Sequence, residues 1–167
     1  MKTVVAFLIV SLACIMACGP GSNNPDAPDT ADSLTVANGY DSVRAAAYGA
    51  DDYGMRKYVM AFLRRGPNRT MDSVKAAELQ AAHLQNITRL AEEGTLVVAG
   101  PFYGDGDLRG IYIFAVDSLA EAEALTNSDP AVQAGSLEME LLEWYGPAAL
   151  MGLEEIHEAV TKSRMFE

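Results

Sequence analysis

Two segments of this chain are apolar on both faces of a β-strand, and they constrain its fold more than any other feature. Residues 58–63 and 111–116 lack the alternation of apolar and polar residues that is typical of a sheet with one face in water. Helices on one side of the sheet would leave a large apolar patch on the other, which promotes aggregation. The pattern favours a homodimer packed sheet to sheet; the alternative is a C-terminal helix that folds back over this face.

Capping residues and apolar spacing predict the other elements. A helix over 72–93 begins at a cap of Asp72 or Ser73 and ends at Gly94, and Ser118 caps a second, shorter helix. Further elements are strands over 95–102 and 110–116, a hairpin loop at 103–107, a helical turn at 129–135, a strand over 137–141 and a C-terminal helix from Pro147. The order strand, helix, strand, strand, helix, strand predicts a ferredoxin-like α+β fold, βαββαβ, with an added C-terminal helix.

The N-terminus resembles the signal of a bacterial lipoprotein. Lys2 precedes an apolar run over residues 4–15 that is too short for a permanent membrane-spanning helix. Ile15-Met16-Ala17-Cys18 is similar to the lipobox, in which the cysteine is lipidated and becomes the new N-terminus. We therefore expect a lipid anchor at Cys18 and a place in the bacterial cell envelope, facing the periplasm or the outside. The alternative is an ordinary secretory signal with an incidental cysteine.

Composition then divides the chain into four parts. Residues 1–17 form the signal peptide, and residues 18–55 are rich in Gly, Pro, Asn, Asp and Ser, which predicts a flexible tether. Residues 56–146 form the α+β domain and residues 147–167 the C-terminal helix. Ordered structure is expected to begin near Arg56.

Charge and cysteine content exclude several classes of function. A formal charge of −11 disfavours nucleic acid, whose phosphates would be repelled, and it disfavours attachment to anionic lipid, so that membrane association is expected through the lipid anchor only. Of the two cysteines, Cys14 would leave with the signal and Cys18 would be acylated, so no thiol remains for a disulfide, a zinc site or a nucleophile. No cluster has the spacing of metal ligands, and we expect neither metal nor cofactor.

Among the titratable residues, His83 is unusual because it falls on the buried stripe of its helix, between Leu79, Ile87 and Leu90. A buried imidazole needs a hydrogen-bond partner, and a carboxylate is a natural one. Such a pair can exchange a proton near neutral pH; equally, it can be a purely structural hydrogen bond.

Arg64, Arg65 and Arg69 place three positive charges within six residues of an acidic chain. They are candidates for binding a carboxylate or phosphate of a small ligand. The alternative is that they are solvated surface charges.

Several motifs together resemble the YCII-related domain family over residues 56–145. They are Ala82-His83-Leu84, Ala99-Gly100-Pro101, the stretch Ser-Asp-Pro-Ala-Val-Gln-Ala-Gly at 128–135, Gly66-Pro67-Asn68-Arg69 and Trp144-Tyr145-Gly146. The resemblance implies a dimeric α+β barrel, with His83 and Asp129 as an acid–base pair. We therefore expect a cofactor-independent enzyme of the isomerase or lyase type that transfers protons on a small molecule. The alternative is a non-catalytic small-ligand-binding or envelope-stress module.

Overall fold

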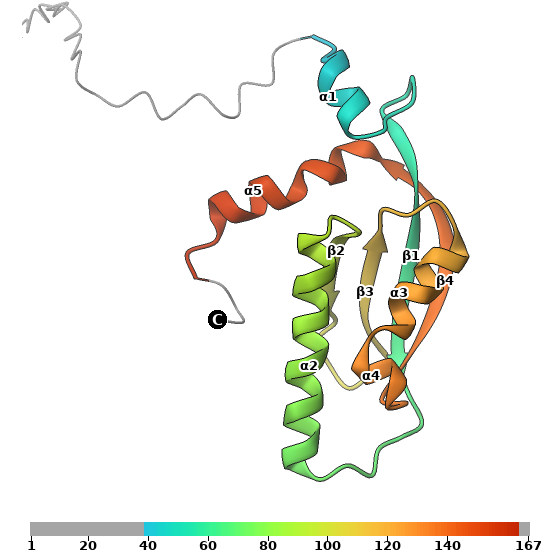
Figure 1. The fold of residues 1–167 in the computed structure, drawn as a ribbon, viewed down its shortest axis with the longest axis vertical. Coiled ribbons are helices and arrows are strands. Elements are labelled where there is room, and N and C mark those ends of the chain that lie inside the picture. The colour runs from blue at the N-terminus through green and yellow to red at the C-terminus, as the bar shows by residue number, and fades with distance from the viewer. Residues whose placement is uncertain (1–38, 164–167) are drawn as a thin grey trace, which may run out of the picture. The chain divides into compact units, whose positions relative to one another are not determined.

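A four-stranded antiparallel sheet carries the fold. The structure is a computed structural model, which describes residues 39–163. The strands are β1 (Met55–Arg65), β2 (Leu96–Pro101), β3 (Leu108–Phe114) and β4 (Leu137–Pro147), and their order across the sheet is β2-β3-β1-β4 (Figure 1). The two segments that are apolar on both faces, residues 58–63 and 111–116, thus lie in the central part of the sheet. The topology confirms the ferredoxin-like α+β prediction.

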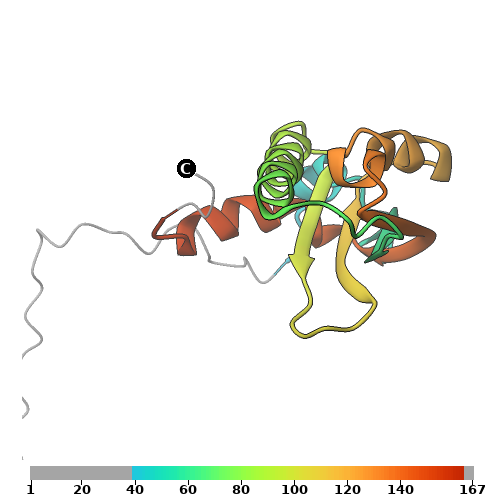
Figure 2. The same cartoon turned by 90° about the horizontal axis from the view of Figure 1, so that it is seen from below.

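Three helices cover one face of this sheet: α2 (Ser73–Glu92), α3 (Leu119–Asn127) and α4 (Pro130–Gln133) (Figure 2). Their starts follow the capping chemistry, since Asp72 accepts the Lys75 N–H and Ser118 accepts the Glu121 N–H. The core lies between helices and sheet and is formed by Val59, Ala61, Leu63, Leu90, Leu96, Tyr112, Phe114 and Ala122.

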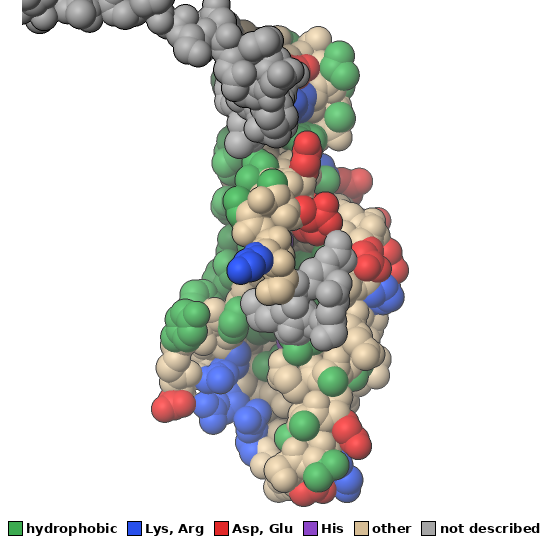
Figure 3. Space-filling model, turned by 90° about the vertical axis from the view of Figure 1, so that its left-hand side faces the viewer, with side chains coloured by type: hydrophobic (Ala, Val, Ile, Leu, Met, Phe, Trp, Pro, Cys, Tyr) green, Lys and Arg blue, Asp and Glu red, His purple; other side chains and the backbone are tan. Residues whose placement is uncertain are grey.

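The opposite face of the sheet is also apolar, and no described helix covers it. Since side chains alternate along a strand, the residues between the core positions of β1 point to this face. It comprises Met60, Phe62, Ile111, Ile113 and Leu142. Met60 pairs with Ile113 and Leu142, and Phe62 pairs with Ile111, so these side chains share one face. Leu142 is half exposed. In Figure 3 this side of the molecule lies along the left edge, where hydrophobic side chains gather.

The chain ahead of β1 differs from the expected tether. Helix α1 (Ser42–Ala47) is capped by Asp41, whose carboxylate accepts the N–H groups of Val43 and Arg44. The Arg56 guanidinium donates to the Tyr48 carbonyl at 3.0 Å. Ordered structure therefore begins before Arg56, because contacts with the domain hold a segment whose composition is typical of a linker. The signal peptide, the lipobox and Cys18 lie outside the described residues.

The C-terminal segment forms a 3-10 turn, η1 (Ala148–Gly152), followed by helix α5 (Leu153–Val160). None of the α5 residues is buried, and the helix projects from one end of the domain (Figure 1). The second face of the sheet is thus not covered by this helix, which was the alternative to a dimer. Within residues 39–163, no helix has both the length and the apolar character needed to cross a bilayer.

Candidate active site

His83 and Asp129 lie against each other in the helical layer. His83 Nδ1 is 2.8 Å from Asp129 Oδ2, His83 is 8% exposed and Asp129 is fully buried. The second carboxylate oxygen, Oδ1, accepts the Ala131 N–H at 2.8 Å, which caps α4. With Asp129 ionised, the imidazole proton resides on Nδ1 and the lone pair on Nε2, the form that a general base requires.

Tyr112 completes this cluster on the other side of the imidazole. Its hydroxyl is 3.4 Å from His83 Nε2, a long contact, and the two rings are nearly parallel with centroids 6.4 Å apart. Burial, and to a lesser degree the charge of Asp129, raises the pKa of the Tyr112 phenol far above its usual value. Tyr112 therefore stays protonated at neutral pH and can donate to the free nitrogen of His83.

A polar network one turn further along α2 positions Asp129. Asn86 Oδ1 accepts from Arg89 Nη2 at 2.8 Å and from Ser128 Oγ at 3.2 Å. Arg89 Nη2 also donates to Ser128 Oγ at 3.1 Å. This network ties α2 to the junction of α3 and α4, directly before Asp129. Asn86 Nδ2 is buried and has no acceptor within the described part of the chain.

A cleft of about 280 Å³ opens beside the dyad, toward the beginning of α2. Leu79 and Gln80 line it one helical turn before His83, and Ala131 lines it two residues after Asp129. His83 and Asp129 do not themselves line the cleft. The remaining lining residues are Asn68, Arg69, Met71, Ala76, Arg109, Ser136 and Leu137.

The three arginines singled out in the sequence have different surroundings. Arg64 pairs with Glu140, donating through Nε and Nη2 at 2.9 and 2.8 Å, and this pairing raises its pKa. Arg65 donates to the Asp105 carbonyl of the hairpin loop at 3.1 Å. Of the three, only Arg69 lines the cleft, so the structure separates residues that are neighbours in the sequence.

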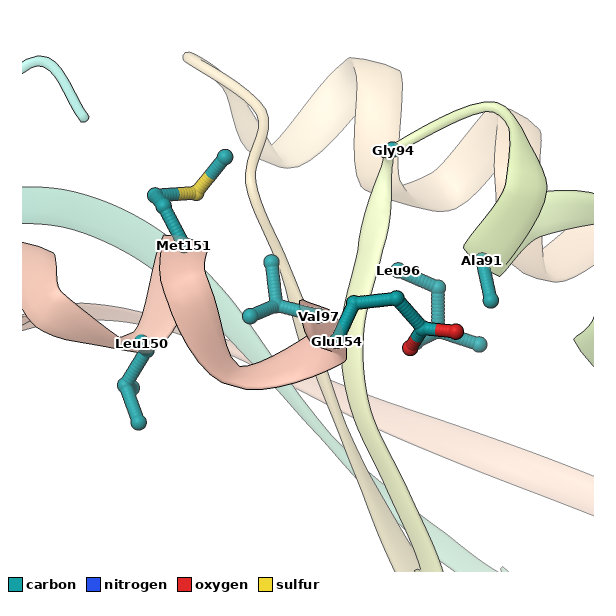
Figure 4. A pocket seen from close by; sticks show the side chains of 7 residues that line it. All are labelled: Ala91, Gly94, Leu96, Val97, Leu150, Met151 and Glu154. Atoms are coloured by element: carbon teal, nitrogen blue, oxygen red, sulfur yellow. The ribbon is translucent and has the colours of Figure 1, made fainter. Parts of the chain in front are cut away.

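A smaller hollow of about 60 Å³ lies at the opposite end of α2 (Figure 4). It is lined by Ala91, Gly94, Leu96, Val97, Leu150, Met151 and Glu154. It has room for a water molecule or two but not for an organic substrate. Between residues 39 and 163, no group of three or more His, Cys, Asp or Glu side chains could hold a metal ion.

The YCII-related domain model matches residues 58–145, which include most of the sheet, both dyad residues and the residues that line the cleft. The chain belongs to the YCII-related domain family. A curated relative, the uncharacterized protein YjpA of Bacillus subtilis (strain 168), is 38% identical over 64 residues, which cover 38% of this chain and 73% of the relative.

Among solved structures, the 5-chloro-2-hydroxyhydroquinone dehydrochlorinase TftG of Burkholderia phenoliruptrix AC1100, in complex with 2,5-dihydroxybenzoquinone, is similar at 23% identity. The similarity covers 53% of this chain and 93% of that one, with a TM-score of 0.40. At this level of similarity, the neighbour gives no information on the chemistry of the present chain.

Sequence reasoning missed Tyr112, Asn86 and Arg109 as members of the site. Tyr112 is a buried core aromatic on β3, with its ring edge-to-face against Phe114. Its hydroxyl reaches His83 only because β3 packs beneath α2. For Asn86 a signal existed, since it lies three residues after His83 on the same helix face.

Proposed function

We propose that this YCII-family protein is a cofactor-independent small-molecule enzyme in which His83 exchanges a proton with the substrate and Asp129 orients its ring. The contact of 2.8 Å between Nδ1 and the fully buried Asp129 carboxylate carries this proposal. Burial of a carboxylate is costly unless it is paired, and this one is held by a histidine and a backbone N–H. Tyr112 lies at the nitrogen that would exchange the proton.

The reaction class that suits such a pair is proton transfer at an activated carbon, as in an isomerisation or an elimination. His83 Nε2 would take the proton as general base. The imidazolium would return it to a neighbouring carbon in an isomerisation, or donate it to the departing group in an elimination, so no oxidant or reductant is needed. Asp129 would stabilise the imidazolium formed in between. The proposal is supported by Leu79 and Gln80, which line the cleft one turn before His83 on the same helix.

Deuterium exchange tests this proposal. The full chain is incubated in D2O with a panel of small carbon acids, and loss of the C–H signal is followed by NMR. We expect the native protein to accelerate exchange for at least one carbon acid of the panel, and His83→Gln to lose this acceleration. His157→Gln is the control and should keep it, because His157 is the other described histidine and is exposed on α5. No acceleration by the native protein, or acceleration that survives His83→Gln in a folded variant, would exclude His83 as the base.

A second candidate is a non-catalytic module that binds a small ligand in the same cleft. The observation that favours it is that His83 and Asp129 do not line the cleft, whereas Arg69 and Arg109 do. Under this alternative, ligand binding persists in His83→Gln, and the native protein accelerates no exchange.

We also propose a homodimer that packs sheet to sheet. Support comes from the apolar face that includes Met60, Phe62 and Ile113, which no described helix covers. A charge placed at its centre by Phe62→Glu should give a monomer in analytical ultracentrifugation, whereas Val74→Glu, on the exposed surface of α2, should not. A native protein that sediments as a monomer at micromolar concentration would exclude this dimer.

Finally, we propose that Cys18 carries a lipid that anchors the chain in the cell envelope. The lipobox-like Ile15-Met16-Ala17-Cys18 supports this proposal. Expression with a labelled fatty acid should label the native chain and not Cys18→Ser, and Cys14→Ser serves as the matched control. Equal labelling of Cys18→Ser would place the lipid elsewhere.

A further inference from the structure

The cleft beside the dyad is lined by two arginines that come from different parts of the chain. Arg69 lies in the loop between β1 and α2, and Arg109 lies on β3. We propose that these two side chains bind the carboxylate of a small organic acid. Binding as such does not require the dyad to be catalytic, and only the identification of this acid as the substrate rests on the function proposed above.

The charges of these two arginines are not neutralised by the protein. Arg44, Arg64 and Arg89 each pair with a carboxylate within 4.0 Å. Arg69 and Arg109, by contrast, form no ion pair with any residue that the structure describes, in a chain with a formal charge of −11. An unpaired guanidinium within an acidic protein favours binding of an anion from solution.

Each guanidinium is held in place and keeps donors free. Arg69 donates through Nη1 to the Ser136 carbonyl at 3.3 Å. Arg109 donates through Nη1 to the carbonyls of Gly104 and Gly106, at 3.0 and 3.3 Å. Within residues 39–163, Nε and Nη2 of both side chains have no protein acceptor. A guanidinium presents five N–H donors in a fixed plane, which matches the two oxygens of a carboxylate.

The loop that carries Arg69 is fastened to the end of α4. Asn68 donates its backbone N–H to the Gly135 carbonyl at 3.0 Å and its Nδ2 to the Ala134 carbonyl at 2.9 Å. The Gly66 N–H donates to the Ser136 carbonyl at 2.9 Å. This wall of the cleft is therefore formed before any ligand arrives, which lowers the entropic cost of binding.

The remaining walls indicate an organic ligand rather than a bare inorganic anion. The apolar lining residues are Met71, Ala76, Leu79, Ala131 and Leu137, and the volume is about 280 Å³. Inorganic phosphate would leave this apolar surface in contact with water, whereas the hydrocarbon part of an organic acid would cover it. Figure 3 shows basic side chains gathered at the lower left of the view.

NMR titration of the full chain with benzoate, its neutral isostere benzamide and inorganic phosphate tests this inference. We expect benzoate to shift the amide signals of residues 68–71 and 131–137 and to bind more tightly than benzamide or phosphate. Loss of a charge-assisted hydrogen bond typically weakens binding about ten- to hundredfold. We expect a loss of this size for Arg69→Gln. We expect it also for Arg109→Lys, which keeps the positive charge but loses the planar pair of N–H donors.

Arg44→Gln is the matched control, because it removes one charge from an arginine that is paired on α1. We expect it to leave benzoate binding unchanged, as should His83→Gln, which separates this inference from the proposed catalysis. The inference would be overturned if millimolar benzoate shifted none of these amides, if phosphate bound more tightly, or if Arg44→Gln weakened binding as much as Arg69→Gln.

Discussion

Replacement of Asp129 by alanine should destabilise the protein more than the loss of an ordinary helix cap. The Ala131 N–H would lose its acceptor, which costs about 1 kcal/mol for a typical N-cap. The buried Nδ1–H of His83 would also lose its partner, which costs a further 1–3 kcal/mol, roughly. We therefore expect Asp129→Ala to lower the free energy of unfolding by about 2–4 kcal/mol.

Asp129→Asn separates the two contacts. The asparagine oxygen can still accept the Ala131 N–H, while its amide would face His83 Nδ1. The imidazole must then accept at Nδ1, so its proton moves to Nε2, beside Tyr112. We expect a smaller loss of stability, about 1 kcal/mol, together with an inverted tautomer that cannot act as a base at Nε2.

Urea denaturation followed by circular dichroism measures the free energies, and nitrogen chemical shifts of the His83 ring report the tautomer. Ser118→Ala is the matched control, because Ser118 caps α3 through the Glu121 N–H at 3.2 Å and has no histidine partner. If Asp129→Ala cost no more than Ser118→Ala, or if Asp129→Asn left the tautomer unchanged, the buried pair would not have the role assigned here.

Three further predictions concern the scaffold. Gly66→Ala should prevent cooperative folding, measured by thermal denaturation, because the new Cβ would collide with the Gly135 carbonyl. Leu90→Ala, in the core at 1% exposure, should cost about 2–5 kcal/mol in urea denaturation. Tyr145 donates to the Asp51 carboxylate, which lowers the pKa of Asp51 below its ordinary value of 3.8. This contact stabilises the fold above that value and is lost as the pH falls through the lowered pKa. Tyr145→Phe should therefore lower the free energy of unfolding at neutral pH but have no effect below the lowered pKa, which denaturation at a series of pH values measures.

Much of the fold could be predicted because its signals are local. Asp72 and Ser118 cap their helices through N–H groups only three residues away, and the apolar character of residues 58–63 and 111–116 places both strands in the middle of the sheet. The helix Ser42–Ala47 was not expected, because a contact with Arg56, on β1, holds a segment whose composition indicates a linker.

The candidate site could be predicted only in part. His83 was identified because a polar ring on a buried helix stripe is anomalous in the sequence itself. The position of Arg64 beside Glu140 depends on the register between β1 and β4, and the position of Arg109 in the cleft depends on how the β2–β3 hairpin meets the β1–α2 loop. No local pattern records either arrangement.

The sequence by itself determined the elements of the α+β domain, their order and the presence of a buried imidazole, because hydrogen bonds and apolar periods within a few residues control these features. Only the tertiary structure decided which carboxylate and hydroxyl contact His83, and which arginines line the cleft. Such contacts join residues such as His83 and Asp129, 46 positions apart, whose meeting requires the whole sheet and its helical layer to pack first.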